Sequence, residues 1–290
     1  MRPYHAMTAA PRSCPALPAV AERQVPAPWN TLDFISDLHL QADESATVEA
    51  FQRYLRATQA NAVFLLGDLF EVWVGDDALL EPGSFESSCA AMLRGAARRR
   101  PLFFMQGNRD FLTGAQFDAL CGTVTLADPT VLDCGGQRLL LSHGDALCLD
   151  DVDYQRFRSM ARSPAWQEAF LAQPLAQRRA QARGIREESE SRKRGAGGNT
   201  GGHDAGMPTY ADLDAEATRS WLRAAGAETL IHGHTHRPAD HDLGDGLRRV
   251  VLSDWDLCAR VPRAEVLRWE RGHGLRRLPL ARVLEQAAAR

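Results

Sequence analysis

The chain has 290 residues, of which 44% are hydrophobic and 24% are charged, and its formal net charge is −3. This length suits one domain with an insertion around a substantial core. The near-neutral charge argues against general nucleic-acid binding, and no apolar run approaches the roughly 18 residues that span a bilayer. The six cysteines form no C-x-x-C pair, which favours reduced, buried thiols in a cytosolic protein.

Residues 1–30 are rich in Ala and Pro, and Arg12 interrupts their only candidate apolar stretch. This composition predicts a disordered N-terminal extension rather than a secretory signal. The folded domain is therefore expected to span residues 31–290.

Short β-type runs then alternate with segments of helical periodicity. Strands are expected at 31–36, 62–66, 102–105, 138–142, 228–231 and 248–252, and helices at 43–59, 85–99 and 212–225. Such alternation predicts the α/β class, with a sheet covered by helices. In sheets of this kind, ligands bind at the carboxyl ends of the strands.

The alternation stops between about residues 150 and 207, where a helical insertion is expected. Tyr154 and Trp166 belong to an apolar set at helical spacing, the stretch 178–194 holds seven basic and three acidic residues, and a Gly-rich loop follows at 195–202. An apolar face for acyl chains beside a basic face for anionic headgroups suits a protein that visits a membrane surface. An ordinary lid that packs its aromatic residues inward fits the periodicity equally well.

Five short polar blocks each follow an expected strand: S-D-L-H (36–39), G-D (67–68), G-N-R-D (107–110), H-G-D (143–145) and G-H-T-H (233–236). Together they offer seven oxygen or nitrogen ligands, namely Asp37, His39, Asp68, Asn108, His143, His234 and His236. In an extended segment alternate side chains point the same way, so the ligands of each D-x-H or H-x-H pair should converge.

Ligands without thiolate favour Mn²⁺, Fe²⁺ or Zn²⁺. Two ions about 3.5–4 Å apart can share a carboxylate and a hydroxide, which supplies a nucleophile near neutral pH. Asp68 is the expected bridging carboxylate. A single block of this kind is often structural, but five in order after strands favour a dinuclear hydrolase. His232 is interpreted as a packing histidine. A scaffold that had lost catalysis would usually lack several of the seven ligands.

Across about residues 31–256 these blocks resemble the calcineurin-like metallophosphoesterases, whose fold is a β-sandwich flanked by helices. The resemblance implies one metal ion on Asp37, His39, Asp68 and His236, and a second on Asp68, Asn108, His143 and His234. It also implies that Asn108, Arg109 and His143 act in catalysis. Arg109 can neutralise charge on phosphoryl oxygens, although a surface ion pair with Asp110 is its plainer alternative.

Longer strings at 69–77, 104–112, 143–151, 154–158 and 231–238 are similar to one subfamily, the lipid A pathway enzymes of Gram-negative bacteria that hydrolyse UDP-2,3-diacylglucosamine. That similarity implies a fold with a helical lid insertion and two Mn²⁺ ions. It also implies attack of a dimetal-bound hydroxide on the uridine-side phosphorus, which gives UMP and 2,3-diacylglucosamine 1-phosphate. We expect a monomer, peripheral on the cytoplasmic face of the inner membrane, and no nucleic-acid partner.

The same similarity implies a set of substrate contacts: Asn108, Arg109, Asp151, Ser189, Lys193 and His234. The subfamily tends to place a lysine seven positions after the serine, where this chain has Ala196. Either Lys193 takes the basic role or the register differs there. The alternative function is that of a soluble metallophosphoesterase acting on nucleotides or other phosphodiesters, for which the apolar insertion has little use.

Overall fold

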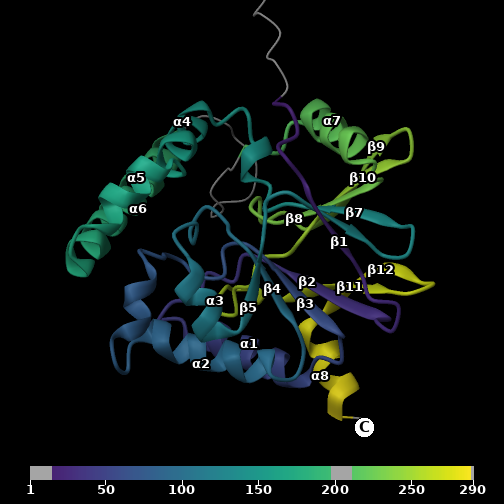
Figure 1. The fold of residues 1–290 in the computed structure, drawn as a ribbon, viewed down its shortest axis with the longest axis horizontal. Helices are drawn as coiled ribbons and strands as arrows, with labels where there is room; N and C mark the ends of the chain where they lie inside the picture. The colour runs from purple at the N-terminus through teal and green to yellow at the C-terminus, as the bar shows by residue number, and fades with distance from the viewer. Residues whose placement is uncertain (1–14, 197–210, 289–290) are drawn as a thin grey trace, which may run out of the picture.

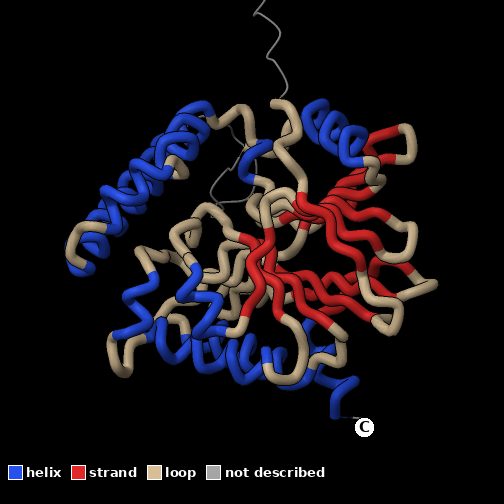
Figure 2. Tube along the Cα trace, viewed as in Figure 1, coloured by secondary structure: helices blue, strands red, loops and turns tan. Residues whose placement is uncertain are grey.

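Two six-stranded sheets face one another and form a sandwich (Figures 1 and 2). The structure, a computed structural model, describes residues 15–196 and 211–288, without the side chains of 186–196. The first sheet has the order β1 (Ala21–Gln24), β6 (Thr130–Asp133), β7 (Arg138–Leu141), β8 (Thr229–His232), β10 (Leu247–Val251) and β9 (Ala239–Gly244). The second has the order β12 (Gly274–Pro279), β11 (Glu265–Glu270), β2 (Thr31–Ile35), β3 (Ala62–Leu66), β4 (Leu102–Met105) and β5 (Thr123–Leu126). The expected α/β class and helix-flanked sandwich are confirmed.

The central strands of the second sheet are buried on both faces. In β3, Phe64 points into the core between the sheets, where its ring stacks on Phe34 with centroids 5.0 Å apart. Its neighbours Val63 and Leu65 point into a separate core on the outer face. Strands covered on both sides read as continuous apolar runs rather than as alternating patterns. This is why the segments 62–66 and 102–105 were predicted with their correct bounds.

Helices cover both outer faces of the sandwich (Figure 1). Helices α1 (Ser45–Ala57), α2 (Phe85–Ala97), α3 (Ala115–Cys121) and α8 (Leu280–Ala288) lie on the second sheet, and α7 (Ala215–Ala225) lies on the first. Local signals set their ends. The Asp214 side chain accepts a hydrogen bond from the Ala217 amide at 2.8 Å, and Gly226 ends the helix in the left-handed region.

The expectation that residues 1–30 form a disordered extension is wrong for residues 15–30. Strand β1 pairs in parallel with β6, Val25 is buried in the core, and the Trp221 indole donates to the Pro15 carbonyl oxygen at 3.0 Å. All four β1 side chains are exposed. Backbone hydrogen bonds to a strand 109 residues further along and polar side-chain contacts such as the Glu22–Arg138 ion pair hold it, so its sequence carries no hydrophobic pattern. Residues 1–14 lie outside the described residues.

The insertion is helical, as expected, and stands beside the sandwich as an arm in Figure 1. It consists of α4 (Val152–Ala161), α5 (Pro164–Leu171) and α6 (Leu175–Ala196). Trp166 stacks on Phe170 at 4.9 Å, and Phe170 is buried against the core of the second sheet. The predicted Gly-rich loop lies outside the described residues from 197 onward, and its first two residues end α6. Among the described helices, none is long and apolar enough to cross a membrane.

Candidate active site

The five polar loops meet at one edge of the sandwich. Strands β2, β3 and β4 are parallel neighbours in the second sheet, as are β7 and β8 in the first, so the loops after them leave in one direction. Backbone bonds tie these loops together: the Asp37 amide donates to Gly67, the His39 amide to Asp68, and the Gly233 amide to His143, all at 3.0–3.1 Å. The second sheet supplies four of the seven predicted ligands and the first supplies three.

The first group of ligands contains Asp37, His39 and His236. The Nε2 atoms of the two histidines lie 3.2 Å apart. The Oδ1 atom of Asp37 is 3.4 Å from His236 Nε2 and 4.0 Å from His39 Nε2. These three ligand atoms all lie within 4.8 Å of one another, which is the spacing that a single metal ion requires.

The second group forms around Asn108. Its Oδ1 atom lies 2.9 Å from His143 Nε2 and 2.7 Å from His234 Nδ1. Asp68 stands between the groups, with Oδ1 at 3.6 Å from His143 Nε2 and Oδ2 at 3.9 Å from His39 Nε2. The structure therefore brings all seven predicted ligands together, and the two oxygens of Asp68 face opposite groups.

The electrostatics of this cluster fit divalent cations. Asp37 and Asp68 are buried carboxylates. Burial lowers the pKa of His143, but the carboxylates of Asp68 and Asp37 outweigh it and raise that pKa to about 9. Burial and the neighbouring His143 lower the pKa of His234 to about 3. Negative charge, neutral imidazole and an amide oxygen within a few ångströms form a donor set suited to Mn²⁺, Fe²⁺ or Zn²⁺, so the cluster is a dimetal site.

Five of the ligands have a backbone in the left-handed region: Asp37, His39, Asp68, His234 and His236 have φ between 47° and 69°. The expectation of extended segments is therefore wrong, although the side chains converge as predicted. Non-glycine residues rarely adopt positive φ, and such strain concentrates at functional sites where the surroundings enforce it. Tight turns after each strand aim the ligands inward.

At two positions only glycine fits, because a neighbouring carboxylate of the site lies directly against the backbone. A Cβ atom on Gly107 would lie 2.1 Å from Asp68 Oδ1, and one on Gly233 would lie 2.2 Å from Asp37 Oδ2. Neither contact is tolerable. The glycines of the G-N-R-D and G-H-T-H blocks thus let the neighbouring carboxylates reach the cluster.

Glu71 and Asp145 lie within the motifs named above, but the sequence analysis gave neither residue a role, and both contact the site. Glu71 contacts His39 and Arg109. Asp110 is not the partner of Arg109 that the plainer alternative required. It is buried and accepts the amides of Leu69 and Gly107, both at 2.7 Å. A buried acidic residue in a motif is the signal that could have identified these roles.

Helix α4 borders the site through Asp145. This buried carboxylate accepts a hydrogen bond from the Tyr154 hydroxyl and another from Arg158 Nε, the latter at 2.8 Å. Arg162 Nη2 lies 3.6 Å from the same carboxylate. Arg162 also donates to the carbonyl oxygen of Gly107 at 2.9 Å. The C-terminal end of α4 is therefore bound directly to two of the loops that carry predicted ligands.

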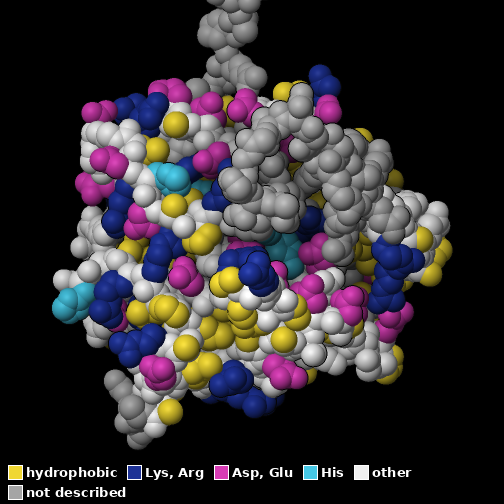
Figure 3. Space-filling view, turned by 180° about the vertical axis from the view of Figure 1, so that it is seen from behind, with side chains coloured by type: hydrophobic (Ala, Val, Ile, Leu, Met, Phe, Trp, Pro, Cys, Tyr) yellow, Lys and Arg dark blue, Asp and Glu magenta, His cyan; other side chains and the backbone are white. Residues whose placement is uncertain are grey.

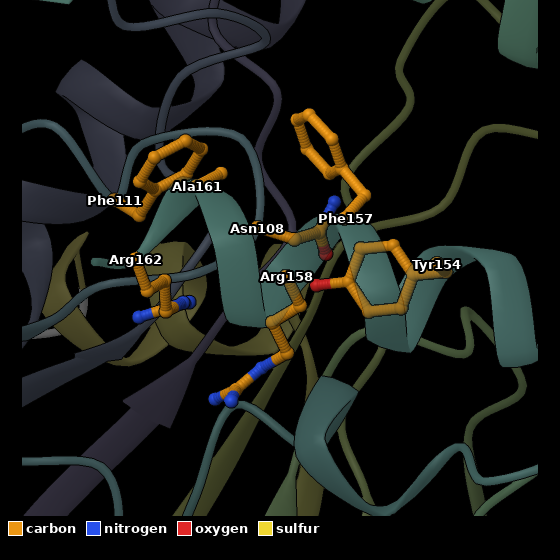
Figure 4. Close-up of a pocket in the computed structure, with 7 residues that line it drawn as sticks. All are labelled: Asn108, Phe111, Tyr154, Phe157, Arg158, Ala161 and Arg162. Carbon is orange, nitrogen blue, oxygen red and sulfur yellow. The ribbon is translucent and has the colours of Figure 1, made fainter. Parts of the chain in front are cut away.

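A small, partly open hollow lies between α4 and the second ligand group. Its lining consists of Asn108, Phe111, Tyr154, Phe157, Arg158, Ala161 and Arg162. In Figure 4 the rings of Phe111, Phe157 and Tyr154 lie around the Asn108 side chain, and the guanidinium groups of Arg158 and Arg162 lie on the other side. The pocket combines an apolar wall with polar groups next to the metal ligands.

The remaining predicted residues are distributed as follows. Asp151 caps α4, its Oδ1 accepting the Tyr154 amide at 3.1 Å. Ser189 and Lys193 lie on α6, where their side chains are outside the described part. His232 belongs to neither ligand group, and its Nδ1 lies 2.7 Å from the Gly233 carbonyl oxygen. Burial lowers the pKa of His232 to about 3, which keeps it neutral.

Residues 31–238 match the family model of the calcineurin-like phosphoesterases. The matched segment contains all seven predicted ligands. The chain belongs to this family, and the fold and site define a metal-dependent hydrolase.

Curated relatives narrow the family further. A UDP-2,3-diacylglucosamine hydrolase of Chromobacterium violaceum is 47% identical over 226 residues, which cover 77% of this chain and 90% of that protein. Proteins of the same name from Ralstonia nicotianae and Stenotrophomonas maltophilia are 43% and 40% identical, covering 82% and 81% of this chain and 89% and 95% of their own lengths. Within the phosphoesterases, the chain is thus a member of the UDP-2,3-diacylglucosamine hydrolase family.

Proposed function

We propose that the chain hydrolyses the pyrophosphate bond of UDP-2,3-diacylglucosamine to UMP and 2,3-diacylglucosamine 1-phosphate, a step of lipid A biosynthesis. The observation that carries the proposal is the identity of 40–47% to hydrolases of that name over most of the chain. A partly apolar pocket beside the dimetal site supports it, because the substrate joins a charged pyrophosphate to acyl chains.

In this proposal one ion is held by Asp37, His39, Asp68 and His236, and the other by Asp68, Asn108, His143 and His234. Mn²⁺ is the proposed metal, with Fe²⁺ or Zn²⁺ as alternatives of similar ligand preference. When bound, two such ions supply an activated water and neutralise charge on the phosphoryl group.

Three side chains are proposed to act in catalysis beside the metal ions. Asn108, Arg109 and His143 are the proposed catalytic residues. The Arg109 guanidinium stands at the site with Nη1 at 3.6 Å from Glu71, and it would donate to phosphoryl oxygens as charge develops on them. Attack at the uridine-side phosphorus expels a phosphate monoester, whose second pKa is about 6. Such a leaving group needs little protonation, so the mechanism requires no dedicated acid.

Substrate contacts are proposed for Asn108, Arg109, Asp151, Ser189, Lys193 and His234. Asp151 lies at the start of α4, next to the pocket residue Tyr154. The contacts of Ser189 and Lys193 stay predictions from sequence similarity. The site would take a lipid-linked UDP-sugar, whose acyl chains fit the aromatic wall formed by Phe111 and Phe157.

We further propose peripheral binding to the cytoplasmic face of the inner membrane, as a monomer and without nucleic acid. Four apolar side chains of the insertion support this, since Val152, Met160, Leu171 and Ile185 are each 41–50% exposed. On the face shown in Figure 3, acidic and basic side chains intermingle rather than forming a surface of one sign, which is unlike a nucleic-acid site. The second candidate remains a soluble phosphoesterase for nucleotides.

The test uses purified protein, Mn²⁺, detergent and UDP-2,3-diacylglucosamine in water labelled with heavy oxygen. We expect rapid UMP release that is lost in Asp68→Ala, with the label in UMP. Label in the sugar phosphate would overturn attack at the uridine-side phosphorus. Turnover of a generic phosphodiester without UMP release would favour the second candidate. Activity independent of detergent or vesicles would count against membrane association.

A further inference from the structure

Glu71 lies three residues beyond Asp68 and touches two different parts of the site. Its Oε2 atom is 2.7 Å from His39 Nδ1, and its Oε1 atom is 3.6 Å from Arg109 Nη1. The carboxylate is only 10% exposed. The Glu71 amide donates to the Leu40 carbonyl oxygen at 3.2 Å, which fixes its backbone beside His39. A single buried carboxylate thus lies between a metal ligand and a cationic side chain.

The contact to His39 determines which ring nitrogen faces the metal group. The carboxylate lies 2.7 Å from Nδ1 without being aligned as its hydrogen-bond acceptor. Its negative charge at this distance favours the tautomer that carries the imidazole proton on Nδ1. The lone pair then lies on Nε2, the atom that faces His236 and Asp37. Carboxylates that accept this second ring proton orient ligating histidines and raise their basicity.

The second ligand group is oriented in a different way. His143 Nδ1 lies 2.9 Å from the carbonyl oxygen of Leu66, so a neutral peptide group of β3 takes the place that Glu71 takes for His39. No substitution of a side chain removes that acceptor. The two metal positions should therefore respond differently to a change at Glu71.

We infer that Glu71 is a positioning residue that holds His39 as a ligand of one ion only and, at the same time, aligns Arg109 toward the phosphoryl group. The part that concerns Arg109 rests on the proposed function, whereas the part that concerns His39 rests on the dimetal site alone. Loss of the carboxylate should release one ion selectively and reduce turnover even when that ion is restored.

The test compares Glu71→Ala and Glu71→Gln with the wild-type chain. Protein stripped of metal is titrated with Mn²⁺ by calorimetry, and spin coupling between bound ions is followed by electron paramagnetic resonance. For the wild type we expect two bound ions. For Glu71→Ala we expect one ion of unchanged affinity and a second weakened about 10–100-fold, the usual effect of removing such a partner. The exposed helix residue Glu49 provides the control, and Glu49→Gln should bind as the wild type does.

Glu71→Gln separates the two contacts. Its amide oxygen keeps a polar acceptor beside His39, but it carries no charge for Arg109. We expect the second ion to weaken less than in Glu71→Ala, and kcat at saturating Mn²⁺ to fall about tenfold or more. Gln has nearly the shape of Glu, so this variant tests the inference even if Glu71→Ala does not fold.

Three outcomes would overturn the inference. The first is wild-type affinity for both ions in Glu71→Ala. The second is an equal loss of both ions, which would make Glu71 a general support of the fold. The third is wild-type metal binding together with wild-type kcat in Glu71→Gln. Metal titration needs no substrate. A wild-type chain that binds two ions yet leaves UDP-2,3-diacylglucosamine intact would therefore contradict the proposed function and not the role of Glu71 toward His39.

Discussion

Arg178 of α6 donates to the carboxylate of Asp77 and to the carbonyl oxygen of Val74, and so joins the helical insertion to the loop after β3. Its Nε also donates to the Gln173 carbonyl oxygen at 2.9 Å. The Arg178 side chain is 2% exposed. Because the same loop carries Asp68 further back, the insertion and the metal site share one anchoring segment.

Replacing Arg178 with Ala should loosen the insertion. The Val74 carbonyl would lose a buried donor, so we expect the free energy of unfolding to fall by about 1–3 kcal/mol, measured by urea denaturation. KM for the lipid substrate should rise, because α4 of the insertion forms one side of the pocket. Arg156→Ala is the control. That residue is 78% exposed in a pair with Asp153, and its loss should cost less than about 0.5 kcal/mol. Equal stability of the two variants would refute the anchoring role.

Substitution of Asp145 should lower the free energy of unfolding strongly, although Asp145 is not one of the predicted metal ligands. Asp145→Asn leaves the cations of Arg158 and Arg162 without their buried partner, and we expect a loss of about 3–5 kcal/mol of unfolding free energy. Tyr154→Phe removes one hydrogen bond and should cost about 1–3 kcal/mol. The comparison is made by chemical denaturation of the metal-free chains. A smaller effect for Asp145→Asn than for Tyr154→Phe would contradict the ionic role of this carboxylate.

Gly107→Ala should displace Asp68. The added Cβ would lie 2.1 Å from the Asp68 Oδ1 and 2.4 Å from its backbone nitrogen, so the proposed bridging carboxylate must shift by about an ångström. A misplacement of that size can reduce activity about 100-fold, and Mn²⁺ affinity should fall as well. Gly95→Ala, in helix α2 with open space around it, is the matched control. It should raise the unfolding free energy by about 0.5–1 kcal/mol. Normal activity of Gly107→Ala would show that the loop relaxes.

Mn²⁺ should stabilise the fold. A ligand that binds only the folded chain adds about 2.7 kcal/mol at a free concentration of 100 times its Kd. Differential scanning calorimetry should therefore show a Tm that rises with Mn²⁺ and falls when a chelator is added. The increase should disappear in Asp68→Ala and persist in Gly95→Ala. A Tm that does not respond to Mn²⁺ in the intact chain would contradict a metal site of this strength.

The five blocks could be predicted from the sequence because each combines short-range signals. A buried parallel strand gives a continuous apolar run, and a ligand directly after it stands out, as at Leu66 and Asp68. The edge strand β9 shows alternating burial, but half of its six residues, Asp240, His241 and Asp242, are polar. Strands β11 and β12 carry several charges. Such strands depend on backbone pairing with distant segments, which local patterns do not encode.

The contacts that orient the ligands could not be predicted from sequence patterns either, because they join residues that are far apart in the sequence. Glu71 and His39 are separated by a complete helix and strand, and the structure alone places their side chains 2.7 Å apart. The left-handed backbone at Asp37 could not be read from D-x-H either, because the spacing is the same in an extended segment. Spacing predicted which residues meet, and tertiary packing decided how they are held.

The division of the ligands between the two sheets has a consequence for biosynthesis. Asp37 and His39 are made early, yet their metal group is completed only by His236, nearly two hundred residues later. The strand that pairs with β2 on its other side, β11, follows later still. A nascent chain on the ribosome therefore lacks a complete cation cage until most of it has been translated. Each ligand group becomes complete only when His234 and His236 have been synthesised, and neither full set exists before then.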